Sequence, residues 1–362
     1  MHSSAGDNQK GRFPRRAAPK ASASRPTSMT MSRQLFTRIA LSAVIAAGFL
    51  YLAFRNVPLV DLGAALQRFD ARWLIPAFAI SLTLQVFRAW RWQLELLPLE
   101  RIALGRLWVV TSVAYMAINL LPVRLGEFVR PWLLSRRSNV TFSNVVGNLV
   151  IEKTMDSVVI VFYILIGLLT TADLPLWVRR GAVFPAVGTV VIVSFVLLLW
   201  WEGEPFVDRR IVRLLPDRVA AGLKRITRAV LDGMRILPEG RLLAGVFFVS
   251  VALWFLPILS SYVIICAFGL AVPFSAALIV FIFIGFGTAL PNAPGMIGTF
   301  QWACVLALEL FGVGKPDALA YGLVLNAIQL LSLVAQGLVA LPLAGVGFAD
   351  LRRARSQLAA EM

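Results

Sequence analysis

Apolar residues fill most of this chain in blocks that approach the length of a membrane span, separated by short basic or Pro/Gly-rich stretches. A membrane helix needs about 20 predominantly apolar residues. Six blocks predict full spans: Ile39–Phe54, Trp73–Phe87, Val145–Thr171, Ala182–Trp201, Leu242–Leu270 and Ala318–Val346. The pattern predicts an all-α integral membrane protein, a polytopic helical bundle of about six full spans.

Two further apolar segments, Leu107–Leu121 and Phe274–Leu290, are short, and each ends in a Pro/Gly element. The elements share the pattern L-P-x-x-x-G, at 121–126 and at 290–295, about half the membrane portion apart. Paired broken segments of opposite orientation are how many transporters build a site at the bilayer midplane. We therefore expect two short, Pro/Gly-interrupted re-entrant segments, although a match this short also arises by chance.

Composition supports a membrane protein: 59% of the residues are hydrophobic, against about 45–50% in soluble domains. The formal net charge of +16 fits basic cytoplasmic loops and anionic lipid better than nucleic acid. The one histidine is His2, which excludes histidine catalysis. We expect no metal and no cofactor, because neither a P-loop nor the metalloprotease or hydrolase signatures occur.

The basic stretches predict how the chain is organised across the membrane. Residues 1–32 form a disordered basic tail, in which Asp7 is the only acidic residue, and 33–350 form the membrane domain. Residues 202–241 form a cytoplasmic loop and 351–362 a short cytoplasmic tail. Both termini are then cytoplasmic, in an inner membrane, if the segment at 107–139 enters and returns. Met29 and Met31 lie just before the first apolar block, so the sequence leaves open whether translation starts at Met1, Met29 or Met31.

Three charges, Arg124, Glu127 and Arg130, are spaced three apart beside the first Pro/Gly element and share one face of a helix. A charged side chain at the centre of a membrane helix costs at least about 2.5 to 3.5 kcal/mol. Two guanidinium groups and one carboxylate leave a surplus positive charge, which suits an anionic headgroup, and arginine binds phosphate bidentately. The alternative is that all three lie at the interface and snorkel.

Charged residues also enter the third span, as Glu152, Lys153 and Asp156. The two carboxylates lie four apart on one face, where they would pair with Arg124 or Arg130 or relay protons. The alternative is a charged helix end at the cytoplasmic surface. By contrast, the Arg/Trp-rich sequence at 88–92 resembles an interfacial belt.

Residues 291–298 combine two prolines with two glycines: Pro291, Pro294, Gly295 and Gly298. Irregular backbone at membrane depth is tolerated where it is buried in protein or lines a cavity. Its free amides, and the helix start near Gly298–Gln301, would bind an anion. A tight turn between helices is the alternative. Amides on the last span, such as Asn326 and Gln336, are more often helix-to-helix contacts than substrate ligands.

The motifs 121–130, 152–156 and 291–298, in this order, resemble the lysylphosphatidylglycerol synthase transmembrane-region family, also called flippase-like or UPF0104 proteins. The resemblance covers roughly residues 35–350. It implies handling of a charged lipid or lipid-linked precursor, and it does not imply the synthase activity, which belongs to a further C-terminal domain in relatives. Gln301 stands where relatives often have Glu, and Asn326 and Gln329 stand where an Arg is common.

The sequence leaves three hypotheses. The first is a lipid translocase without enzyme activity, whose partners are anionic phospholipids or lipid-linked phosphates. In this hypothesis Arg124 and Arg130 hold the phosphate and Glu127 orients the two arginines. The Pro/Gly element at 291–298 forms the opposite wall of the site. The second is a membrane-embedded transferase acting on lipid-linked sugars. The third is a scaffold that transports nothing. The oligomeric state is left open.

Overall fold

The computed structural model describes residues 43–120, 129–136, 138–171, 174–203, 239–288 and 294–345, together with scattered positions between 205 and 234. Within these residues every regular element is a helix, which confirms the all-α fold class. The elements are α2 (Leu59–Gln67), η1 (Ala71–Trp73), α3 (Leu74–Leu96), α4 (Leu104–Leu120), α5 (Val129–Ser135), α6 (Phe142–Thr170), α7 (Leu176–Gly181), α8 (Val183–Glu202), α11 (Gly240–Ala267), α12 (Phe274–Thr288), η5 (Pro294–Met296), α13 (Thr299–Glu309) and α14 (Lys315–Leu343).

Four helical stretches of the described chain are long and apolar enough to cross a membrane: Ala71–Leu96, Leu176–Glu202, Gly240–Ala267 and Lys315–Leu343. A fifth candidate is the pair Ala43–Phe54 and Leu59–Gln67, which is bent by 81° at its break. The polytopic helical architecture is therefore confirmed, whereas the predicted number of six full spans is not. The helix α6 occupies the remaining predicted block and carries the charged residues of the site described below.

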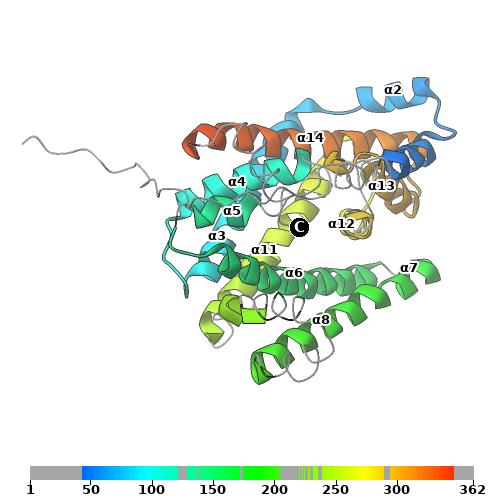
Figure 1. The fold of residues 1–362 in the computed structure, drawn as a ribbon. Coiled ribbons are helices and arrows are strands. Elements are labelled where there is room, and N and C mark those ends of the chain that lie inside the picture. The colour runs from blue at the N-terminus through cyan, green and yellow to red at the C-terminus, as the bar shows by residue number, and fades with distance from the viewer. Residues whose placement is uncertain are drawn as a thin grey trace, which may run out of the picture.

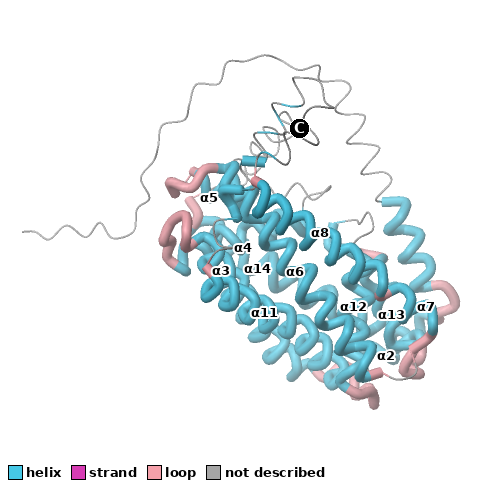
Figure 2. Tube along the Cα trace, turned by 90° about the horizontal axis from the view of Figure 1, so that it is seen from below, coloured by secondary structure: helices cyan, strands magenta, loops and turns pink. Residues whose placement is uncertain are grey.

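The long helices lie side by side, and α11 crosses through the middle of the bundle (Figures 1 and 2). Helix α11 packs against α3, α6 and α12, while α14 packs against α4, α13, α2 and α3. The outermost long helix, α8, leaves large apolar side chains such as Phe184, Val190 and Trp201 exposed. An apolar outer face suits a helix that meets lipid, because there the surrounding medium is itself apolar.

The two short apolar segments form α4 and α12, and each packs against the short helix that follows it in the chain, α5 and α13 respectively. Each therefore folds back on its successor instead of continuing as one long helix. That these segments enter the membrane and return on the same side stays a prediction. The first motif itself, 121–128, lies outside the described residues, as does 289–293.

Candidate functional site

Charged side chains from three helices meet inside the bundle. Arg91 of α3 donates from Nη2 to Glu152 Oε1 (2.8 Å) and from Nη1 to Asp156 Oδ1 (2.5 Å). Glu152 and Asp156 lie one turn apart on α6, so a single guanidinium spans both carboxylates. Arg91, Glu152 and Asp156 are 2%, 2% and 8% exposed. The alternative of a charged helix end at the surface is therefore wrong for these two carboxylates.

Arg130 of α5 joins this group from a third helix. Its Nη1 donates to Glu152 Oε2 (2.5 Å), and its guanidinium carbon lies 3.8 Å from the centre of the Trp92 ring. The predicted pairing of Arg130 with a carboxylate of α6 is confirmed. Arg130 is 4% exposed, so it does not snorkel. Its guanidinium is already engaged by Glu152 and Trp92, which leaves less of it for a phosphate than the clamp hypothesis assumed.

Hydrogen bonds from neighbouring side chains complete this charged cluster, which we define as Arg91, Glu95, Arg130, Glu152 and Asp156. Glu95 Oε1 lies 3.6 Å from Arg91 Nε, one turn along α3. Outside the cluster, Trp254 of α11 donates from Nε1 to Asp156 Oδ1 (2.8 Å), and Trp92 donates from Nε1 to Asn148 Oδ1 (3.2 Å). The cluster thereby ties α3, α5, α6 and α11 together.

The prediction of an interfacial belt at 88–92 is wrong for Arg91 and Trp92, because both are buried, at 2% and 0% exposure. An interfacial belt and a buried ionic site use the same residue types, which is why composition alone misled. The available signal was spacing: Arg88, Arg91 and Glu95 lie three and four residues apart, as do the charges of α6.

Four other predicted site residues give a different outcome. Lys153 of α6 is exposed and is not without an interaction partner, but it does not belong to the buried group around Glu152. Arg124, Glu127 and Pro291 lie outside the described residues.

The second predicted element, around Gly295 and Gly298, lies against α14 and the helix Ala43–Phe54. Asn326 of α14 donates from Nδ2 to the carbonyl oxygen of Gly295 (3.1 Å), so this amide does join two elements, as expected. Gly298 has φ +93° and leaves no room for a Cβ, which would collide with the backbone oxygen of Ala46. Glycine is required there for both reasons. Pro294 is exposed.

Gln301 forms a cap on α13 instead of leaving the amides of the element free. Its Oε1 accepts from the Gly298 N–H (2.7 Å), and its side chain is buried. A glutamine three residues after the cap position satisfies a backbone donor that the helix itself cannot. The Gly298 amide is therefore occupied within the protein, which weakens the expectation that it binds an anion.

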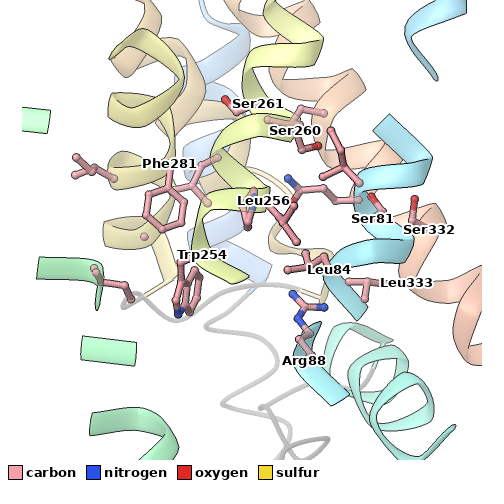
Figure 3. Close-up of a pocket in the computed structure, with 18 of the residues that line it drawn as sticks. Ser81, Leu84, Arg88, Trp254, Leu256, Ser260, Ser261, Phe281, Ser332 and Leu333 are labelled. Carbon is pink, nitrogen blue, oxygen red and sulfur yellow. The ribbon is translucent and has the colours of Figure 1, made fainter. Parts of the chain in front are cut away.

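A cavity of about 360 Å³ lies among α3, α6, α11, α12 and α14, with Pro185 of α8 also in its wall, and extends to Arg88 (Figure 3). Its walls are mainly apolar, with a few polar groups among them. The lining includes Ser81, Leu84, Arg88, Ile160, Ile164, Trp254, Pro257, Ser260, Ser261, Phe281, Ile282, Gly285, Phe286, Leu325, Gln329, Ser332, Leu333 and Gln336. Trp254 belongs both to this wall and to the hydrogen bonds of the charged cluster, so cavity and cluster are neighbours.

Helical periodicity explains which residues reach the cavity. Ser81, Leu84 and Arg88 occupy one face of α3, and Arg91 and Glu95 continue toward the cluster. On α11 the wall includes Pro257, which has no backbone N–H and interrupts the helical hydrogen bonds. Within the described chain, no group of three or more His, Cys, Asp or Glu side chains is arranged to hold a metal ion.

Comparison with known proteins gives two findings. A family model described as "Lysylphosphatidylglycerol synthase TM region" matches residues 39–337. Two curated relatives are each named "UPF0104 membrane protein", both from Methanothermobacter thermautotrophicus strain Delta H. One is 23% identical over 300 residues, covering 78% of this chain and 88% of the relative. The other is 24% identical over 264 residues, covering 67% and 75%.

Proposed function

We propose that this chain, which belongs to the lysylphosphatidylglycerol synthase TM region family, moves an anionic membrane lipid or a lipid-linked phosphate between the leaflets of the membrane. The observation that carries the proposal is the cavity inside the bundle, with apolar walls and a guanidinium at one end. Such a cavity suits an amphiphile, since the walls accept a tail and the polar points accept a headgroup. The proposal is transport without chemistry at the lipid.

The charged cluster supports this function from beside the cavity. Ionic groups inside a membrane bundle are costly, and they commonly line pathways for substrates or ions. Arg91 and Arg130 hold α3, α5 and α6 in register through Glu152. We assign them to the framework of the site, and we assign contact with the lipid to residues that face the cavity. Arg124 and Glu127, from the clamp hypothesis, remain candidates to be tested by substitution.

We further propose that the protein lies in the inner membrane with both termini cytoplasmic, on the basis of its basic stretches. This orientation places positions 135 and 225 on the same, cytoplasmic side. Single cysteines at Ser135 and Arg225, in a protein whose Cys266 and Cys304 are replaced by Ala, would be labelled by an impermeant reagent from that side alone. Labelling of position 135 from the periplasm would contradict the orientation.

Transport itself is tested in vesicles that contain the purified protein. A fluorescent anionic lipid is placed in both leaflets, and a membrane-impermeant reductant quenches the outer label. We expect complete and fast quenching in vesicles that contain the protein. In protein-free vesicles we expect quenching of about half the label. Equal quenching in both, for phosphatidic acid and for a lipid-linked phosphate, would refute transport and favour a transferase or a scaffold.

A further inference from the structure

Among the described residues, Arg88 differs from Arg91 and Arg130 in having no carboxylate in direct contact. Arg91 and Arg130 are both ion-paired. Among the residues that the structure describes, the ion pairs do not include Arg88. Its guanidinium instead lies over the ring of Tyr115, 4.1 Å from the ring centre, and points into the cavity (Figure 3). The positive charge at this end of the cavity is therefore not neutralised by a direct contact.

Neighbouring side chains fix the position of Arg88. Gln85, which is 1% exposed, accepts from Arg88 Nη1 (3.1 Å), and its own Nε2 donates to Ser112 Oγ of α4 (3.3 Å). The Tyr115 ring supports one face of the guanidinium from the same helix. A guanidinium held in this way is preorganised, which lowers the entropy lost when a ligand binds.

The cavity also contains polar side chains whose hydrogen-bonding capacity is unmet. Ser260 of α11 and Ser332 and Gln336 of α14 line it and are 4%, 3% and 6% exposed. Within the described part of the chain, Ser260 Oγ, Ser332 Oγ and Gln336 Oε1 have no hydrogen-bond partner. Buried polar atoms are usually satisfied, so unmet atoms on three side chains that line one cavity indicate a ligand with complementary donors, which these side chains would reach by rotating toward it.

We infer that this cavity binds an anionic amphiphile whose phosphate contacts Arg88 and whose headgroup hydroxyls bond to Ser260, Ser332 and Gln336. The tail lies along the apolar wall that includes Ile160, Ile164 and Ile282. This inference rests on the proposed function and deepens it, because it assigns the phosphate to Arg88 in place of Arg124 and Arg130. The chemistry required is an anionic phosphate on an apolar chain, and headgroup hydroxyl groups add further hydrogen bonds where the lipid has them.

Binding to the purified full-length protein in detergent, measured by native mass spectrometry, tests the inference. The probes have identical acyl chains and differ in headgroup: phosphatidic acid, phosphatidylinositol and phosphatidylcholine. Phosphatidylcholine carries the same phosphate, but its trimethylammonium group neutralises that charge and is repelled by Arg88. We therefore expect the two anionic lipids to bind roughly tenfold more tightly than phosphatidylcholine. Arg88→Gln should abolish that preference, and Arg88→Lys should retain only part of it, because lysine lacks the planar fork.

Two controls separate the site from general charge and from folding. Arg72, whose side chain is 93% exposed, lies on η1 near the start of the same helix, so Arg72→Gln should leave the preference unchanged. Gln336→Leu leaves Arg88 in place and removes an acceptor for headgroup hydroxyl groups. It should weaken the binding of phosphatidylinositol relative to phosphatidic acid, and leave the preference of phosphatidic acid over phosphatidylcholine unchanged. If Arg88→Gln fails to fold, Arg88→Lys and Gln336→Leu still decide the matter. The inference would be overturned if Arg88→Lys kept the full preference for anionic lipids and Gln336→Leu kept the wild-type preference between phosphatidylinositol and phosphatidic acid.

Two further results distinguish this inference from the proposed function. If glycerol 3-phosphate displaces phosphatidic acid at equal concentration, the ligand is a soluble phosphate ester and the assignment to a lipid is overturned. Selective binding by the wild type without any leaflet exchange would refute transport while leaving the Arg88 site in place. Leaflet exchange that is unaffected by Arg88→Gln would leave transport in place and refute the site.

Discussion

Glu152 is the residue on which the charged cluster depends most, because it accepts hydrogen bonds from two arginines on two different helices. Arg91 Nη2 and Arg130 Nη1 lie 2.8 Å and 2.5 Å from its two oxygens. Glu152→Ala removes the carboxylate and leaves two buried guanidinium groups facing a gap. Removing one partner of a buried ion pair typically costs about 3 to 5 kcal/mol. We expect a loss of that size in the free energy of unfolding.

Glu152→Gln should cost less, since the amide oxygen still accepts one hydrogen bond. The matched control is the pair Arg68–Asp317, which is 3.2 Å apart but has side chains 60% and 22% exposed. Solvent screens that pair, so Asp317→Ala should cost only about 0 to 1 kcal/mol. Unfolding in mixed micelles with increasing dodecyl sulfate, followed by circular dichroism, measures both. Equal losses for Glu152→Ala and Asp317→Ala would refute the reasoning about burial.

Two predictions concern the Pro/Gly element. Gly298→Ala should impair insertion or transport more than Gly269→Ala. Both glycines have positive φ, +93° and +63°, but only at Gly298 does the new Cβ collide with backbone, that of Ala46. Membrane accumulation and lipid exchange measure the effect, and equal behaviour of the two variants would mean that the close approach is unimportant. Gln301→Leu should lower stability by about 0.5 to 2 kcal/mol through loss of the cap, whereas Gln301→Glu should retain it, as thermal unfolding in detergent measures; a Glu variant as unstable as the Leu variant would contradict this role.

Much of the architecture was visible in the sequence, because a membrane helix must be apolar over its length. Helices occupy each predicted block, and the pair between Arg130 and Glu152 follows from placing charges on neighbouring helices. The number of full spans was harder to predict, since α6 combines apolar length with charges that pair only after the bundle has formed.

The sequence did not reveal the cavity or its arginine. Six helices contribute to the lining, and no periodicity within one helix predicts how the others approach. Arg88 and Arg91 lie three residues apart, yet one faces the cavity and the other faces the carboxylates of α6. The two side chains lie on the same side of α3 but at different heights along it, so the neighbours that each one meets depend on tertiary packing. Gln301 is a similar case, because its role becomes clear only when the turn at Gly298 is known.

The central claim is that a lipid passes through the cavity beside Arg88, and blocking that cavity tests it most directly. Gly285 of α12 lines the cavity, and a Cβ added there meets no atom within 4 Å, so a larger side chain enters open space. Gly63 of α2 also has open space around its Cβ, and no residue of α2 belongs to the lining, which makes Gly63 a matched control.

The measurement is the rate of leaflet exchange of a labelled phosphatidic acid in vesicles that contain equal amounts of inserted Gly285→Leu, Gly63→Leu or wild-type protein. The account predicts that Gly285→Leu slows exchange to the rate of protein-free vesicles, while Gly63→Leu exchanges lipid as fast as the wild type. Exchange by Gly285→Leu at the wild-type rate would contradict the claim that the cavity is the path of the lipid.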